Sequence, residues 1–439
     1  MNSNQYGKAK KKSLSYHTHL ESTVCFSMNP DEITPHLFRT EYSKIVAVLC
    51  KTFNIQHIEI AEDIASETFL KASEYWAING LPENPAAWLY TVAKNKAKDY
   101  FKHLKVVEKN NNRILHTTAS EDQQIIDFEP QNISDSQMEM IFTVCHPINS
   151  QATQIGLALQ ILCGFSIQEI ANAFLSKPET IKKRLLRGRE SLRNRHFKIE
   201  SLDEKDILHR LDTVLTALYL LFNEGYFSKS HHLLIRKDLC LEAIRLTLVL
   251  TEHSLTNTPK TNALLALMCF QSSRLDARVN REGETILFDE QDEAVWDQTL
   301  IEKGNYYLVQ AFDTDCNGVS KYHIEAAIAY WHTTADNPGK WQQILNLYNQ
   351  LLSLEYSPIT ALNKIFVFSK VHGNEMALIE AERLNLTDNE YYHGLLGYLY
   401  SESNIAKAIR HFEKAIQLTQ SKAEKQTLLR QISILKQKI

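Results

Sequence analysis

Hydrophobic residues recur at helical spacing through most of the chain, and this pattern predicts an all-α protein. Three helical segments are predicted: from Ile33 to about His103, from about Ser136 to Arg195, and from Leu202 to the end. The first segment includes helices at Glu62–Trp76 and Ala86–Lys105. Strand-type alternation occurs only briefly, near Thr285–Phe288. The order of the segments predicts two small helical domains followed by a C-terminal domain of helical hairpins.

Two stretches lack helical periodicity. Residues 1–30 form a predicted flexible tail, in which Met28, just before Asn-Pro-Asp-Glu, is an alternative start. Residues 107–137 form a predicted linker, because polar residues are followed by an acidic run with no basic residue inside it. The acids of this run are Glu121, Asp122, Asp127, Glu129, Asp135 and, just beyond the linker, Glu139. The predicted domains are residues 31–106, after the tail, then residues 138–199, after the linker, and residues 200–439, which follow directly.

The composition is that of a globular protein, with 439 residues, 44% apolar residues and 23% charged residues. The longest apolar stretches, Leu215–Phe222 and Ala263–Phe270, fall short of the roughly 18–20 residues that span a membrane. The seven cysteines are widely spaced and form no C-x-x-C pair, which is typical of core residues in a reducing compartment. We therefore expect a cytoplasmic protein without a membrane segment or a metal.

Residues 165–193 carry the signals of a helix-turn-helix. Ser166 and Glu169 form a capping box, and Phe165 precedes it as one half of a hydrophobic staple with Ile170, so a short helix begins here. A second helix follows, with Pro178 in its first turn, where the missing N–H costs little. Two helices joined by so short a turn are typical of DNA-binding motifs.

The second helix of this motif has one apolar stripe and an otherwise basic surface. Its stripe is Ile181, Leu185, Gly188 and Leu192, which predicts that this side packs inward. The side chains that could contact phosphates and base edges in a major groove are Lys177, Thr180, Lys182, Lys183, Arg184, Arg187 and Arg189. The alternative interpretation is an ordinary core helix with a solvated basic face.

A second basic surface is predicted on Ala86–Lys105. Leu89, Ala93, Ala97 and Tyr100 share a predicted buried stripe, and lysines recur beside it at helical spacing. Like charges one turn apart repel, so an anionic partner is expected to offset them. Aromatic side chains between the lysines suit unstacked single-stranded bases, although core packing is the alternative for each ring. The candidate contacts are Trp88, Lys94, Asn95, Lys98 and Lys102.

Three motifs, in this order, resemble the sigma-70 family of transcription initiation factors, specifically the small extracytoplasmic-function type. Glu62–Ala72 resembles the helix of region 2 that binds polymerase. Pro85–Ala97 resembles the following helix, which melts and reads the −10 element, and Ser166–Arg193 resembles the region 4 motif that reads the −35 element. The resemblance implies that core RNA polymerase and promoter DNA, double-stranded at −35 and melted at −10, are partners. It also makes Asp63 and Glu67 candidates for polymerase contact, with a solvated face as the alternative.

The resemblance continues into the C-terminal half. It rests on Leu221–Tyr226, Asp238–Leu246, Asp289–Asp297, Glu325–Ala329 and Pro358–Asn363, which are similar to a subgroup with a long tetratricopeptide-like extension. Ala408, Phe412 and Ala415 show the spacing of the second helix of such a repeat. The resemblance implies that the extension modulates activity, with a regulatory partner or ligand of its own.

Two other classes of function compete with this interpretation. A DNA-binding repressor or a scaffold would use only the helix-turn-helix and the repeats, and would leave the basic, aromatic helix at Ala86–Lys105 without a purpose. An enzyme is disfavoured, and no cofactor is expected, because the sequence offers no nucleophile set, metal-ligand spacing or phosphate-binding glycine loop. Asp289 and Glu290 are predicted to cap a helix that contains Trp296, Leu300 and Ile301.

Overall fold

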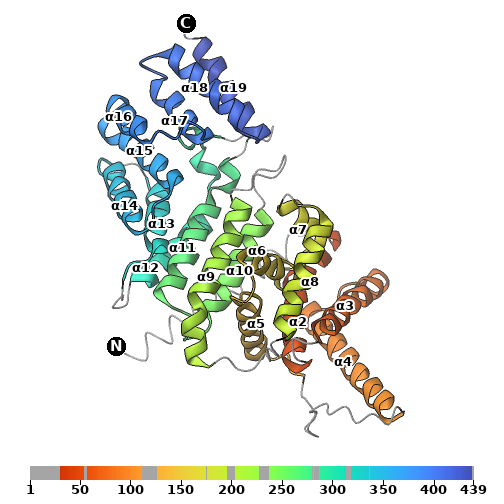
Figure 1. The fold of residues 1–439 in the computed structure, drawn as a ribbon. Helices are drawn as coiled ribbons and strands as arrows, with labels where there is room; N and C mark the ends of the chain where they lie inside the picture. Colours follow the sequence, from red (N-terminus) through yellow and green to blue (C-terminus); the bar gives the residue numbers. More distant parts are fainter. Residues whose placement is uncertain are drawn as a thin grey trace. The chain divides into compact units, whose positions relative to one another are not determined.

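The computed structural model describes residues 30–53, 57–110, 126–174, 176–194, 203–226, 237–278, 280, 286–312, 318–335 and 337–437. These residues form helices and turns and no strand, which confirms the all-α prediction (Figure 1). The brief alternation near Thr285–Phe288 gives no described strand, since Phe288 begins a 3-10 turn. Residues 1–29 of the predicted tail lie outside the described part of the chain.

The chain divides into two compact units. The first consists of Met1–Val144, Leu157–Ser166 and Arg187–Ser201, and the second of Cys145–Gly156, Ile167–Leu186 and Leu202–Ile439. The helices of the first unit are α2 (Pro30–Phe53), α3 (Ile58–Asn79), α4 (Pro85–Asn110), α5 (Pro130–Val144) and the π-helical segment η2 (Ala158–Leu162). Helix α2 contacts all four of the others, so the core of this unit forms around it.

Helix α5 differs from the sequence prediction, because it begins at Pro130, inside the predicted linker. The preceding residues also pack: Ile126 is buried, and the Phe128 ring stacks on Tyr90 at 4.8 Å between centroids. The acidic composition obscured a buried side of the helix that starts with Ile133. Residues 111–125 of the predicted linker lie outside the described residues.

The remaining helices follow one another along the chain. They are α6 (Gln151–Leu157), α7 (Ile167–Ala173), α8 (Pro178–Asn194), α9 (Glu204–Tyr226), α10 (Lys237–Thr251), α11 (Pro259–Ser273), α12 (Gln298–Phe312), α13 (Lys321–Thr333), α14 (Lys340–Leu354), α15 (Pro358–His372), α16 (Asn374–Leu384), α17 (Glu390–Tyr400), α18 (Ile405–Leu418) and α19 (Lys422–Lys436). From α9 onward each helix contacts the next, which gives a stack of helical hairpins (Figure 1).

The hairpin of α17 and α18 shows how small and aromatic residues set this packing. Ala408, Phe412 and Ala415 are buried on one side of α18, as their spacing predicts. Gly397 on α17 lies directly against the Phe412 ring, and a Cβ added at Gly397 would lie 2.5 Å from Phe412 Cδ1. The absent side chain at Gly397 therefore allows the two helices to approach closely.

The cap predicted at Asp289 and Glu290 is wrong. Helix α12 begins only at Gln298, and its first turn is capped by Asp297, whose Oδ1 accepts a hydrogen bond from the Leu300 backbone N–H at 3.0 Å. Trp296 precedes the helix instead of lying in it. Asp289 and Glu290 form the 3-10 turn η4 (Phe288–Glu290), where their carboxylates bind Lys370 on α15 and Arg430 on α19 at 2.6 Å each.

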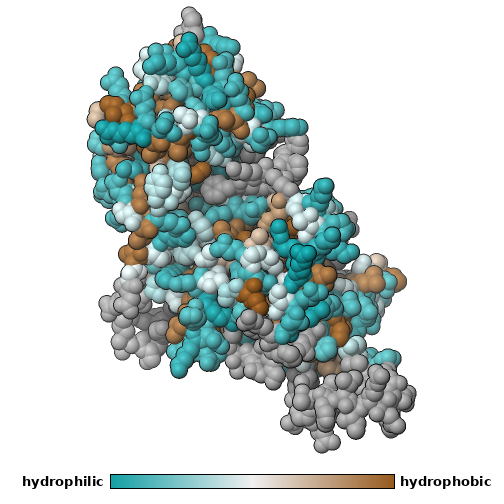
Figure 2. Space-filling model, viewed as in Figure 1, coloured by the Kyte–Doolittle hydropathy of each residue, from teal (hydrophilic) through white to brown (hydrophobic). Residues whose placement is uncertain are grey.

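Burial of the described cysteines agrees with their interpretation as core residues. Cys50, Cys145, Cys163, Cys240 and Cys269 are buried free thiols. Burial raises the pKa of Cys145, Cys240 and Cys269 to about 12, so these thiols stay protonated. Cys25 and Cys316 lie outside the described residues. The surface in Figure 2 is largely hydrophilic, with apolar residues scattered over it.

Candidate nucleic-acid interface

Helices α7 and α8 form the predicted helix-turn-helix, since α7 ends at Ala173 and α8 begins at Pro178. The predicted inward stripe of α8 is confirmed, because Ile181, Leu185 and Leu192 are 1–3% exposed. Leu185 packs against α6, where a Cβ added at Gly156 would lie 3.1 Å from its Cδ2 atom. This packing fixes which side of α8 faces outward.

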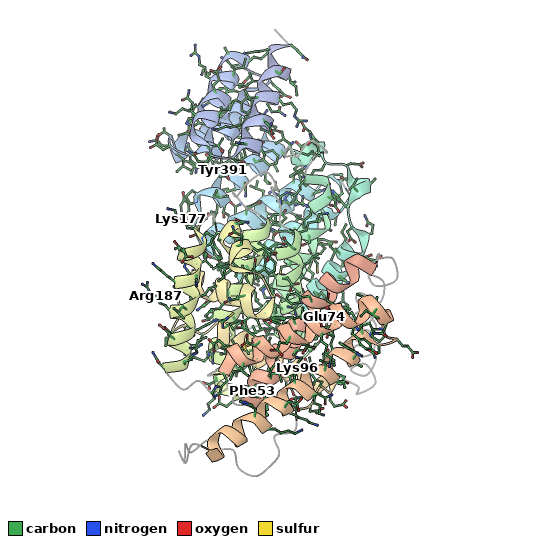
Figure 3. The ribbon with its side chains drawn as sticks, turned by 90° about the vertical axis from the view of Figure 1, so that its right-hand side faces the viewer. Phe53, Glu74, Lys96, Lys177, Arg187 and Tyr391 are labelled. Carbon is green, nitrogen blue, oxygen red and sulfur yellow. The ribbon has the colours of Figure 1, made fainter. Side chains whose placement is uncertain are left out.

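The outward side of α8 carries most of the predicted DNA contacts. The exposed members are Lys177, Thr180, Lys182, Lys183 and Arg187 (Figure 3 labels Lys177 and Arg187). Arg184 is half-buried, with its guanidinium carbon 5.8 Å from the centroid of the Phe174 ring. Five of the seven predicted side chains are thus open to solvent, four of them on α8 and Lys177 immediately before it.

Arg189, the seventh, points elsewhere. It is 9% exposed, and its Nη1 and Nη2 atoms donate to the two carboxylate oxygens of Glu62 on α3, each at 2.7 Å. Nη2 also donates to Gln160 Oε1 at 2.9 Å, and nearby Arg193 forms an ion pair with Glu59. In this structure the Arg189 guanidinium is therefore engaged with protein and does not face a nucleic acid.

Helix α4 has the predicted buried stripe and an exposed basic side. Leu89, Ala93 and Ala97 are fully buried, whereas Tyr100, the fourth predicted member of the stripe, is only half-buried. Of the predicted contacts, Asn95, Lys98 and Lys102 are exposed, and Lys94 and Trp88 are half-buried. Asn95 and Lys98 are three residues apart and Lys98 and Lys102 are four apart, so the three side chains share one side of the helix.

The Trp88 ring belongs to an aromatic group with two residues of α3. Its centroid lies 5.6 Å from that of Tyr75, in a stacked arrangement, and 5.4 Å from that of Trp76. Trp76 is buried, whereas Tyr75 is 48% exposed. Trp88 is thus both a packing residue between α3 and α4 and the half-buried edge of an exposed aromatic surface.

The predicted polymerase contacts lie on the outside of α3. Asp63 and Glu67 are both exposed, and Glu67 accepts a hydrogen bond from Lys96 of α4 at 2.6 Å. The same side of the helix continues through three exposed residues that sequence reasoning missed, Leu70, Glu74 and Ile78 (Figure 3 labels Glu74). Leu70 is 60% exposed and Ile78 85% exposed.

These five residues are called the α3 stripe below: Asp63, Glu67, Leu70, Glu74 and Ile78. Their spacing of four, three, four and four residues places them on one side of a helix. The signal is present in the sequence, since the stripe continues the periodicity of Asp63 and Glu67. Large apolar side chains left exposed beside acids indicate a partner surface that is basic and apolar.

Features of two other kinds are absent from the described residues. No group of three or more His, Cys, Asp or Glu side chains in the described ranges could hold a metal ion. No helix within these ranges is both long and apolar enough to cross a membrane.

Comparison with known proteins identifies two segments of the chain. Residues 37–106 match Sigma-70 region 2, and residues 210–312 match a family of unknown function, DUF6596. The uncharacterized protein R00370 of Rhizobium meliloti (strain 1021) is 31% identical over 376 residues, which cover 84% of this chain and 88% of that protein. No solved structure is significantly similar to the chain. Helix α3 and all of α4 except its last four residues thus lie within the segment that matches region 2.

Proposed function

We propose that this chain, which belongs to the sigma-70 family, is a sigma factor of the extracytoplasmic-function type that directs core RNA polymerase to promoters. In this proposal the α3 stripe contacts polymerase, the exposed sides of α4 and of α8 contact DNA, and the helices after α8 modulate that activity. The protein would act in the cytoplasm and needs no cofactor of its own.

One observation carries the proposal: the segment that matches region 2 presents two different exposed surfaces. Helix α3 offers acids and apolar side chains, and α4 offers lysines, Asn95 and the edge of Trp88. A factor that joins a protein to a DNA strand needs both. A repressor that uses only a helix-turn-helix has no use for exposed Leu70 and Ile78, which is why we do not favour that alternative.

The basic side of α8 supports readout of the −35 element. Thr180, Lys183 and Arg187 lie on the outward side of the helix, where an α-helix can enter a major groove. We assign a phosphate contact to Lys182, and contacts with phosphates or neighbouring bases to Lys177 and Arg184. Arg189 can join them only where its ion pair with Glu62 opens.

The proposed functional segments are residues 31–106 for polymerase and the −10 element, 138–199 for the −35 element, and 200–439 for modulation. The segment 107–137 would connect the first two, with part of it ordered in α5. The hairpin of α17 and α18, with Gly397 against Phe412, supports a tetratricopeptide-like description of the last segment.

Transcription from an unselected DNA mixture tests this function and requires no identified promoter. Core RNA polymerase and the purified chain are incubated with sheared genomic DNA of the source organism, and the 5′ ends of the transcripts are sequenced. We expect start sites that require the chain and share two upstream sequence elements. Transcripts identical to those of core polymerase alone would refute a role as sigma factor.

A further inference from the structure

Arg274, the residue that follows α11, is a buried cation with no anionic partner among the described residues. It is 9% exposed, and its Nε atom is buried and makes no hydrogen bond. No described Asp or Glu forms an ion pair with its guanidinium. An ionised side chain that leaves water without a partner is strongly unfavourable, and native proteins normally pair such a group. Buried Arg189, which holds Glu62 with two hydrogen bonds, shows the usual arrangement in this same chain.

The described groups beside the Arg274 guanidinium are a tyrosine hydroxyl and an aromatic ring. The guanidinium donates a hydrogen bond to the hydroxyl of Tyr226 at the end of α9. Its carbon lies 5.2 Å from the centroid of the Phe288 ring. A phenol and an aromatic face stabilise a cation but do not neutralise it.

A second arginine adds to the positive charge. The Arg278 guanidinium carbon lies 4.0 Å from the centroid of the Tyr226 ring, and Nη1 donates to the Tyr226 carbonyl oxygen at 3.4 Å. Burial raises the pKa of the Tyr226 hydroxyl, but the charges of Arg278 and Arg274 outweigh burial and lower that pKa below its usual value. Two arginine side chains thus lie beside the same tyrosine.

The neighbouring titratable groups do not supply the missing charge. His332 lies across the Phe288 ring, 4.8 Å between centroids. Burial, Arg274 and Lys340 lower the pKa of His332 to about 3, so its imidazole is neutral. Burial raises the pKa of Glu325 to about 7, and the charges and hydrogen bonds that act on its carboxyl come from Tyr219, Lys321 and Glu355, not from Arg274.

Other buried polar atoms on the same segments also lack a hydrogen-bond partner within the described chain. They are Gln271 Oε1, Ser272 Oγ, Gln291 Oε1, Trp296 Nε1 and His332 Nδ1. These residues precede Arg274 on α11, lie in the short turns that follow it, or lie on α13 beside Phe288. Arg278, Phe288 and His332 are only half-buried, so part of each of these side chains is open to solvent.

We propose that Arg274, Arg278 and His332 form a binding site for a small organic anion. Its carboxylate or phosphate group would lie on the planar fork of the Arg274 guanidinium, which matches both groups with two parallel hydrogen bonds. The imidazole of His332 can donate one further hydrogen bond. The Phe288 ring, with Trp341 at 6.4 Å between centroids, favours an anion with an apolar or aromatic body over an inorganic ion.

Calorimetric titration of the full chain with sodium benzoate, and separately with inorganic phosphate, tests the site at constant ionic strength. We expect saturable binding of benzoate that is tighter than that of phosphate, because only benzoate carries an aromatic body for the Phe288 ring; tighter binding of phosphate would contradict a site for an organic anion. Arg274→Met should weaken binding at least about tenfold, because it removes the charged fork. Arg274→Lys keeps the charge without the fork and should give an intermediate affinity.

The matched control is Arg383→Met, which removes a cation that is 70% exposed on α16 and paired with Glu380. It should bind the anion as the wild type does. Circular dichroism shows whether each variant is folded, and Arg274→Lys decides the question where Arg274→Met does not fold. The proposal fails where neither anion binds the wild type, or where the folded Arg274 variants bind as tightly as the wild type.

Discussion

Arg189 and Glu62 are 127 residues apart in the sequence, yet the two guanidinium Nη atoms donate to the two carboxylate oxygens at 2.7 Å. The pair joins the C-terminal end of α8 to α3, inside the first compact unit. Its side chains are only 10% and 17% exposed, so the pair is largely shielded from solvent. Two helices to which we assign different partners are thus bound to each other in this structure.

Replacing Arg189 tests the stability contribution of this pair. Arg189→Met leaves the Glu62 carboxylate, which is largely shielded from solvent, without its partner, and should lower the free energy of unfolding of the first unit by about 3 kcal/mol. The shift of the urea midpoint, followed by near-ultraviolet circular dichroism, measures the loss. Arg187→Met on the same helix is the control, because Arg187 is exposed and its replacement should change stability by less than about 0.5 kcal/mol. Equal effects of the two replacements would contradict the structural role of Arg189.

The same helix supplies a test of DNA contact. Removing a lysine or arginine that touches only phosphate, as we expect for Lys182→Met, should weaken binding to all sequences and reduce the slope of log K against log salt by about one. Removing a base contact, as we expect for Arg187→Met, should cost about 1–3 kcal/mol on the preferred sequence alone. Fluorescence anisotropy of duplex DNA over a salt series measures both. A salt slope and affinity that neither replacement changes would show that α8 does not bind DNA.

The hairpin of α17 and α18 predicts opposite effects for two neighbouring glycines. Gly397→Ala places a methyl group against the Phe412 ring and should destabilise the extension by about 1–3 kcal/mol through overpacking. Gly394 is on the same helix, but a Cβ added there has no atom within 4 Å. Gly394→Ala should therefore leave the stability of the extension unchanged or raise it by up to about 1 kcal/mol. Thermal unfolding followed by far-ultraviolet circular dichroism compares them. Close packing of Gly397 on Phe412 would be contradicted if Gly397→Ala raised the melting temperature as much as Gly394→Ala.

Glu325 predicts a pH dependence of the extension. Burial raises the pKa of its carboxyl from 4.5 to about 7, while the Tyr219 hydroxyl donates to it at 3.2 Å. Because the folded state favours the protonated form, the stabilising effect is complete below pH 4.5 and is lost as the pH rises through about 7. Glu325→Gln imitates the protonated acid at every pH. The stability of the wild type relative to this variant should therefore fall between about pH 5 and pH 8, and a constant difference would contradict the assignment.

Much of this fold could be predicted from spacing alone. The inward stripe of α8, the buried stripe of α4 and the packing of Phe412 follow directly from helical periodicity, because each stripe is local in the sequence. The start of helix α5 could not be predicted, since the acids around Pro130 hide the periodicity that begins at Ile133. The cap of α12 is ambiguous in the sequence because several acids in a row, Asp289 to Asp297, each fit the preference for a cap.

Side chains that meet across long sequence distances could not be predicted. Charge clustering groups Arg189 with the DNA contacts, and no local pattern indicates that Glu62 is its partner. The isolation of Arg274 depends on which residues surround it in space, so it is visible only in the structure. The α3 stripe lies between these cases, because periodicity places Leu70 and Ile78 beside Glu67 but only the structure shows them exposed.

Binding of the labelled full chain to core RNA polymerase tests the central claim most directly. Fluorescence anisotropy compares the wild type with Asp63→Arg/Glu67→Arg, which reverses two charges of the α3 stripe, and with Glu402→Arg/Glu413→Arg, which reverses two exposed acids of the extension. We predict that the wild type and the control bind and that the α3 variant binds at least about tenfold more weakly. Absence of binding by the wild type would contradict a sigma factor, and equal binding by all three proteins would contradict the polymerase contact assigned to α3.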